Sequence, residues 1–60
     1  MRIGDIINVK DIVDGGHWKG KVTEIHKTKL ITVQDKGINF AVVNLDELSF
    51  DSNKNEYWEK

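Results

Sequence analysis

The sequence predicts a small all-β protein, folded as a strongly curved barrel of five short strands. β-Branched residues are spread through the first 43 positions, and runs of strong helix formers are missing. Short apolar clusters recur between turn residues, which is the pattern of an all-β chain. A length of 60 residues leaves room for only one small domain.

The first two strands are expected on either side of a glycine turn. The segment from Ile6 to about Val13 carries apolar residues whose spacing departs from strict alternation, which predicts a bend or bulge near Lys10. The turn at residues 14–16 ends this strand, because glycine accepts the positive φ that tight turns require. The second strand is expected from about Trp18 to His26, and Gly20 marks a coil or a close approach of the backbone.

Two more strands, a helical turn and a short last strand complete the predicted barrel. The third strand, Leu30–Gln34, is joined to the fourth, Ile38–Val43, by hairpin turn residues at 35–37. Residues 44–48 offer an asparagine cap, two acids and two leucines three apart, which predicts one turn of 3₁₀ helix. A fifth strand is expected to begin at residues 49–50.

The last ten residues are predicted to lie outside the barrel. Residues 1–50 form the predicted barrel domain, and residues 51–60 form a polar tail that contains Tyr57 and Trp58. Free aromatic side chains lower solubility, and chain ends fray unless they are fixed. We therefore expect these two aromatics to dock on the barrel or on a neighbouring subunit.

The order of the predicted elements matches a known pattern of small barrels. The residues that carry the match are Gly4–Asp5 before an alternating strand with Ile7 and Val9, then Gly20–Val22, then Ile31 and Val33, and finally Leu45–Leu48. This pattern resembles that of the SH3-like barrels, including the KOW and Tudor-like modules, over about residues 3–50. The resemblance implies a five-stranded barrel with a 3₁₀ turn before the last strand.

Size, composition and charge limit the expected partners. The chain has no cysteine, so a domain this small depends on an idealised core, a ligand or self-association, and we expect a tightly packed barrel, an oligomer or both. No apolar run is long enough to cross a membrane, and a cytoplasmic protein is expected. Residues 17–36 carry a local charge of +3 and residues 44–60 carry −3, within a net charge of −1. This balance argues against long duplex DNA as a partner, because a strongly basic surface favours that binding.

No motif indicates catalysis. No serine or cysteine nucleophile lies in a sharp glycine-flanked turn, and His17 and His26 lack a marked catalytic partner. We therefore expect a protein that is not an enzyme and that holds neither a cofactor nor a metal ion.

The candidate ligand-binding residues are concentrated in the second strand and the turns near it. Trp18 is interpreted either as a cover for one end of the barrel or as a stacking platform for a base. Lys19 and Lys21 share one face of the strand and are placed to meet one anionic group together. If the fourth strand turns its Ile38, Phe40 and Val42 side chains toward the core, the amide of Asn39 is expected to point outward. The remaining candidates are His17, His26, Lys27, Lys29 and Asn39.

Three functions remain open at this point. The first is the capture of a small anionic nucleotide without turnover, in a pocket between subunits. In size and character the chain is similar to phage sponge proteins, which sequester cyclic-dinucleotide or related immune signals and so counter host defence. The second is an SH3-like protein-recognition module that inhibits a host protein. The third is the binding of single-stranded nucleic acid, for which Trp18 and the nearby lysines would be responsible.

Overall fold

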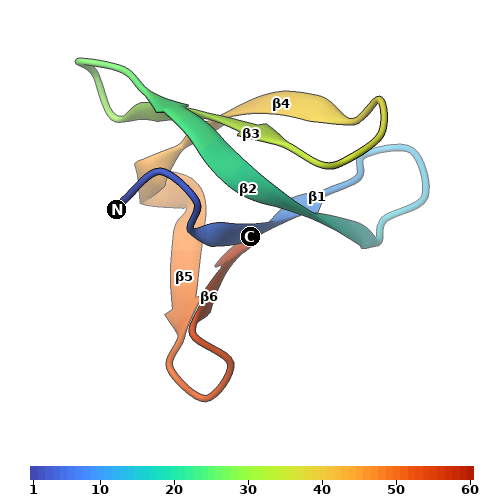
Figure 1. The fold of residues 1–60 in the computed structure, drawn as a ribbon. Coiled ribbons are helices and arrows are strands. Elements are labelled where there is room, and N and C mark those ends of the chain that lie inside the picture. Colours follow the sequence, from blue (N-terminus) through green and yellow to red (C-terminus); the bar gives the residue numbers. More distant parts are fainter.

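The computed structural model describes residues 1–60, and it shows one curled sheet of six strands with the shape of a half-barrel (Figure 1). The sheet order is β4-β3-β2-β1-β6-β5. The prediction of an all-β fold is confirmed, with six strands in place of the expected five. The elements are β1 (Ile6–Lys10), β2 (His17–Ile25), β3 (Leu30–Gln34), β4 (Phe40–Asn44), the 3₁₀ turn η1 (Leu45–Glu47), β5 (Leu48–Asp51) and β6 (Glu56–Glu59).

Strand β6 enters the sheet between β1 and β5. It runs parallel to β1, with Ile7 opposite Tyr57 and Asn8 opposite Trp58, and antiparallel to β5. Figure 1 shows β5 and β6 as a hairpin that extends away from β2, β3 and β4. The buried amide of Asn8 donates a hydrogen bond to the carbonyl oxygen of Tyr57 at 3.0 Å. The segment predicted as a tail therefore contains a strand of the sheet.

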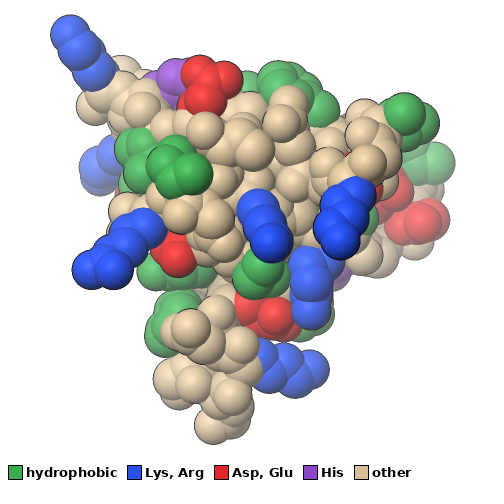
Figure 2. Space-filling view, in the orientation of Figure 1, with side chains coloured by type: hydrophobic (Ala, Val, Ile, Leu, Met, Phe, Trp, Pro, Cys, Tyr) green, Lys and Arg blue, Asp and Glu red, His purple; other side chains and the backbone are tan.

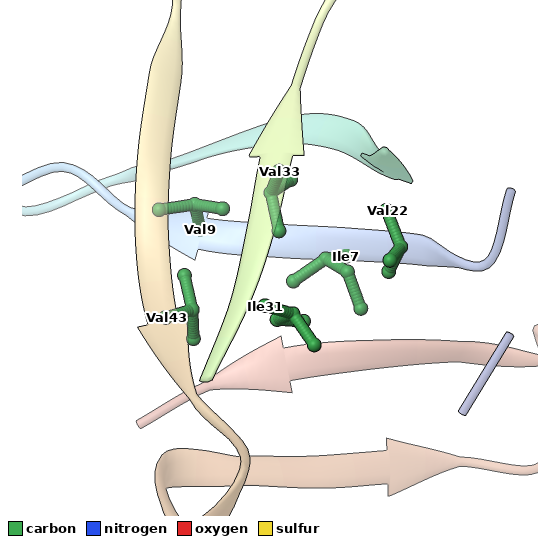
Figure 3. Close-up of a cluster of buried hydrophobic side chains, with 6 residues drawn as sticks. All are labelled: Ile7, Val9, Val22, Ile31, Val33 and Val43. Carbon is green, nitrogen blue, oxygen red and sulfur yellow. The ribbon is translucent and has the colours of Figure 1, made fainter. Parts of the chain in front are cut away.

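The core lies on the inner, concave face of β1 to β4. Because side chains alternate along a strand, every second residue of these strands points to this face. Figure 3 shows the six buried apolar side chains turned toward one another. They are Ile7, Val9, Val22, Ile31, Val33 and Val43.

The first strand is shorter than its apolar residues predict. It ends at Lys10, and Ile12 and Val13 lie in the loop that follows, where both are almost fully exposed. The side-chain carboxylate of Asp11 accepts a hydrogen bond from the Val13 N–H at 2.8 Å, and its carbonyl oxygen accepts one from the Gly15 N–H at 2.9 Å. These bonds turn the backbone before it reaches Ile12, so the expected strand from Ile6 to Val13 is wrong in its second half.

The face of β4 that points toward the core is not the one that we expected. Ala41 and Val43 pair with Val33 and Ile31 of β3, which are buried, whereas Phe40 and Val42 point outward. Both faces of this strand are apolar, so alternation alone does not decide which is buried. The pairing register decides it, because a shift of one residue exchanges the two faces.

The turn η1 joins the two edge strands of the half-barrel. The side chain of Asn44 accepts a hydrogen bond from the Asp46 N–H at 2.9 Å, which confirms the predicted 3₁₀ turn with its asparagine cap. The Leu45 N–H also donates to the Lys29 carbonyl oxygen at 2.7 Å and fixes the turn to the β2–β3 loop. Strands β4 and β5 are the two edges of the sheet and do not pair, so the barrel stays open between them.

Gly20 marks a close approach of three groups in the centre of the sheet. A Cβ atom added there would lie 2.8 Å from the Gln34 carbonyl oxygen and 2.9 Å from side-chain carbons of both Trp18 and Val33. One of these groups is backbone and another belongs to the core, so neither moves at little cost. The structure thus explains why glycine stands at this position of β2.

Gly20→Ala is expected to lower the free energy of unfolding by about 1–3 kcal/mol, because the added methyl group overpacks the core. Gly37→Ala is the matched control, since the nearest atom to its Cβ would be an Asp35 oxygen at 3.5 Å. The control should stay within about 0.5 kcal/mol of the parent protein. Urea denaturation followed by circular dichroism measures both changes, and equal stability of the two variants would contradict the packing argument.

Candidate ligand-binding site

The outer face of the sheet carries a row of functional side chains across three strands. Asn8 of β1 lies opposite Lys19 of β2 on one side and opposite Trp58 of β6 on the other. The next row along β1 and β2 places Ile6 opposite Lys21. Figure 2 shows basic side chains close together near the middle of the face in view, over the region where β1 and β2 run. The strand pairing therefore brings an indole and two ammonium groups onto one side of the sheet, around the buried Asn8 amide.

A cavity of about 640 Å³ opens on this face, between β2 and the β3–β4 loop. Its volume lies in the range of about 300–1,000 Å³ that is usual for small-molecule sites. Three lysines against one aspartate give its lining a net charge of +2. The polar side chains that line it are Lys19, Lys21, Thr23, Gln34, Asp35 and Lys36.

The three lysines of this cavity differ in their existing partners. The Nζ atom of Lys19 lies 3.2 Å from Oε2 of Glu56, whose side chain is only 7% exposed, while that of Lys19 is 59% exposed. A buried carboxylate needs a partner, so Glu56 holds Lys19 in place. Lys21 and Lys36 form no ion pair. These two ammonium groups are the ones that are free to bind an anion.

The β3–β4 loop is organised by the carboxylate of Asp35. Its Oδ2 atom accepts a hydrogen bond from the Asn39 amide at 2.7 Å, and its Oδ1 atom accepts one from the Gly37 N–H at 2.7 Å. The bond from the Asn39 side chain is the main reason that the pKa of Asp35 lies below its ordinary value. Desolvation is the next largest cause and opposes it, and the Gly37 and Asn39 N–H groups lower the pKa further. Asn39 is exposed, but its amide is already hydrogen-bonded to Asp35 within this loop.

His17 and Trp58 form an aromatic pair at one end of the same face. The His17 Nε2 atom donates a hydrogen bond to the Glu59 carbonyl oxygen at 2.9 Å. Its ring meets that of Trp58 edge to face, with centroids 5.1 Å apart and an interplanar angle of 70°. Trp58 is half-buried, so part of the indole remains open to solvent.

Trp18 lies on the other side of the sheet from the lysine cavity. It is the residue before Lys19 in β2, so its side chain points inward, where it packs against the core. It also lines a separate apolar groove of about 520 Å³, together with Val9 and Val43. Trp18 and the lysines therefore line two different cavities.

The remaining candidates lie at the far end of β2. The Nε2 atom of His26 is 2.9 Å from Oγ1 of Thr32. Lys27 and Lys29 lie in the β2–β3 loop, and the Nζ atom of Lys29 is 3.4 Å from a carboxylate oxygen of Asp46. None of these side chains lines the lysine cavity. The predicted ligand residues are thus divided among three parts of the molecule.

Sequence reasoning missed two residues of this face. Lys36 was counted only in the local charge of residues 17–36, because its position beside Lys19 and Lys21 depends on how the β3–β4 hairpin folds back. Trp58 was assigned to docking, because nothing local indicates that β6 pairs with β1. The alternation of residues within one strand was the signal that correctly placed Lys19 and Lys21 on the same face.

No family model, curated protein or solved structure matches this chain. No helix of the structure is long and apolar enough to cross a bilayer. No group of three or more His, Cys, Asp or Glu side chains is placed to hold a metal ion. The chemistry of the cavity residues is therefore the observation that bears on function.

Asn39→Ala is expected to raise the pKa of Asp35 toward its ordinary value of 3.8, because the largest stabiliser of the ionised form is lost. A depressed pKa stabilises the fold above the unfolded-state pKa, and this contribution disappears as the pH falls through the folded-state pKa. The variant should therefore lose the part of this contribution that comes from the Asn39 side chain at neutral pH, while the backbone bonds to Asp35 remain.

Titration of the side-chain carboxyl carbons by NMR measures the Asp35 pKa directly. Asn53→Ala is the control, because Asn53 lies in the β5–β6 turn, far along the chain from this loop. An unchanged Asp35 pKa in Asn39→Ala would show that the amide does not stabilise the carboxylate.

Proposed function

We propose that this chain is a non-enzymatic binding protein that captures a small anionic nucleotide on the outer face of its sheet. The observation that supports the proposal is that Lys19, Lys21 and Lys36 line the same cavity, whose lining has a net charge of +2. Lys21 and Lys36 have no ion pair to break, so a phosphate group gains charge-assisted hydrogen bonds from both.

An aromatic surface lies within reach of the lysines. Trp58 and Lys19 are on strands that flank β1, so their backbones lie about 10 Å apart at the usual spacing of neighbouring strands. A nucleotide whose phosphate occupies the cavity can therefore extend its base toward the indole, and stacking on an aromatic ring is a common way to hold a base. In this proposal Trp58 takes the stacking role that the sequence suggested for Trp18.

The distribution of charge favours a small ligand over a long polymer. Lys27 and Lys29 lie in the β2–β3 loop and do not line the cavity, and Lys29 is already paired with Asp46. The basic side chains therefore form no continuous track for a nucleic-acid backbone. A mononucleotide or cyclic dinucleotide, with one or two phosphates, matches the two unpaired ammonium groups.

The lining of the cavity favours capture without turnover. It contains no histidine, cysteine or serine. Its one acid, Asp35, is a weak base, because hydrogen bonds within its loop hold its pKa below the ordinary value. Capture of this kind is the activity of a sponge protein, and we propose a phage anti-defence role in the cytoplasm of a host cell as its setting.

Lys21→Gln and Lys36→Gln are each expected to weaken nucleotide binding by about tenfold or more, because a hydrogen bond to a charged group contributes about 1.5–3 kcal/mol. Isothermal titration with a panel of cyclic dinucleotides and mononucleotides measures the loss. Lys54→Gln removes the same charge from the β5–β6 turn and should leave the affinity unchanged. Trp58→Leu should weaken binding of nucleotides more than binding of inorganic phosphate.

Three results would count against this function. The absence of binding across the whole panel would remove it. If Lys21→Gln, Lys36→Gln and Lys54→Gln all lose the same amount of nucleotide affinity, the effect comes from the overall charge and not from a specific site. Binding of single-stranded oligonucleotides that falls steeply with salt would favour the nucleic-acid function instead.

A further inference from the structure

A groove lined mainly by apolar residues follows the free edge of β4, and Lys10, Asp11, Asn39 and Glu59 also line it. This strand pairs only with β3, so the backbone groups on its other edge have no partner strand. All five residues from Asn39 to Val43 line the groove of about 520 Å³. Successive side chains of a strand point to opposite faces, so a groove that contacts all five runs along the edge of the strand. This is the geometry that a further strand would occupy.

The groove is surrounded by exposed apolar side chains. Among those that line it, Ile12 is 92% exposed, Val13 91%, Phe40 60% and Val42 54%, and Ile38 beside the groove is 98% exposed. Ile12 and Val13 come from the β1–β2 loop, across the groove from β4. An apolar surface of this kind on a small protein marks an interaction site.

The edge of β4 lacks the features that keep edge strands from pairing. Natural edges are protected by charged side chains, proline or bulges. Residues 37–45 contain no charged residue and no proline, in a chain of which 32% is charged. The register of β4 against β3 is continuous, without a bulge. The strand is therefore open to another strand on this side.

We propose that β4 pairs antiparallel with β4 of a second copy of this chain, so that two half-barrels share one continuous sheet. With Val42 opposite Val42 on the two-fold axis, Ala41 of each copy faces Val43 of the other, and Phe40 faces Asn44. Inner-face apolar side chains then meet each other, as a self-complementary interface requires. Ile12 and Val13 lie on the far side of the groove, where they cover the incoming strand.

Charge and size select a second copy as the occupant. Lys36 precedes β4 and Glu47 follows it, and neither forms an ion pair within the chain. Antiparallel pairing brings the Lys36 end of each copy to the Glu47 end of the other, whereas parallel pairing would bring like charges together. A chain with six buried apolar side chains and no cysteine also gains a larger core from the pairing. The groove and the lysine cavity share no lining residue, although Lys36 lines the cavity and also lies near the proposed interface.

Val42→Lys tests the interface. It would place two ammonium groups opposite each other on the two-fold axis, and it should raise the dimer dissociation constant by about a hundredfold or more. Because Val42 points outward in the single chain, the fold should survive, and circular dichroism checks this. Ser49→Lys puts the same charge on β5, the other edge strand, and should leave the dimer intact.

Sedimentation equilibrium over a wide range of protein concentration measures the oligomeric state. A concentration-dependent dimer that Val42→Lys dissociates and Ser49→Lys preserves is the expected result. A parent protein that stays monomeric at every concentration would overturn the inference, and the groove would then be left to a strand of another protein. A dimer that is unaffected by Val42→Lys, or weakened equally by both variants, would place the contact elsewhere.

Discussion

Strand β1 pairs antiparallel with β2 on one side and parallel with β6 on the other. Its pairing with β6 determines which side chains lie next to one another on the outer face of the sheet. The amide of Asn8 is buried between β2 and β6, and its hydrogen bond to the Tyr57 carbonyl fixes where β6 lies along β1. A buried amide left without this partner would cost about 1–3 kcal/mol. Because β6 is held in this register, Trp58 reaches His17 and Glu56 reaches Lys19.

Local sequence signals located most of the central sheet. The bounds of β3 were predicted to the residue, β2 to within one residue at each end, and the asparagine cap identified η1. The side of β4 that faces the core was not predictable, because both of its faces are apolar and only the register with β3 separates them. Strand β6 was missed because its four residues contain no β-branched side chain, and its partner β1 lies at the other end of the chain.

The sequence predicted the part of the candidate site that lies within one strand. It did not predict the part that requires several segments of the chain to come together. Lys19 and Lys21 were paired correctly by alternation within β2, and the same alternation places Trp18 on the other side of the sheet. Gly20, between them, is the point at which the chain has no room for a side chain. Lys36 and Trp58 reach this face through the β3–β4 hairpin and through β6, which are relations between segments distant in sequence.

The pair between Lys19 and Glu56 links occupancy of the cavity to the β5–β6 hairpin. Glu56 belongs to β6 and is almost fully buried, so it relies on the Lys19 ammonium as its counter-charge. An anion that draws this ammonium toward itself weakens the restraint that ties β6 to β2, whereas an anion held by Lys21 and Lys36 alone leaves it intact. The Lys19 ammonium thus links anion binding in the cavity to the attachment of β6, the last strand of the chain, to the rest of the sheet.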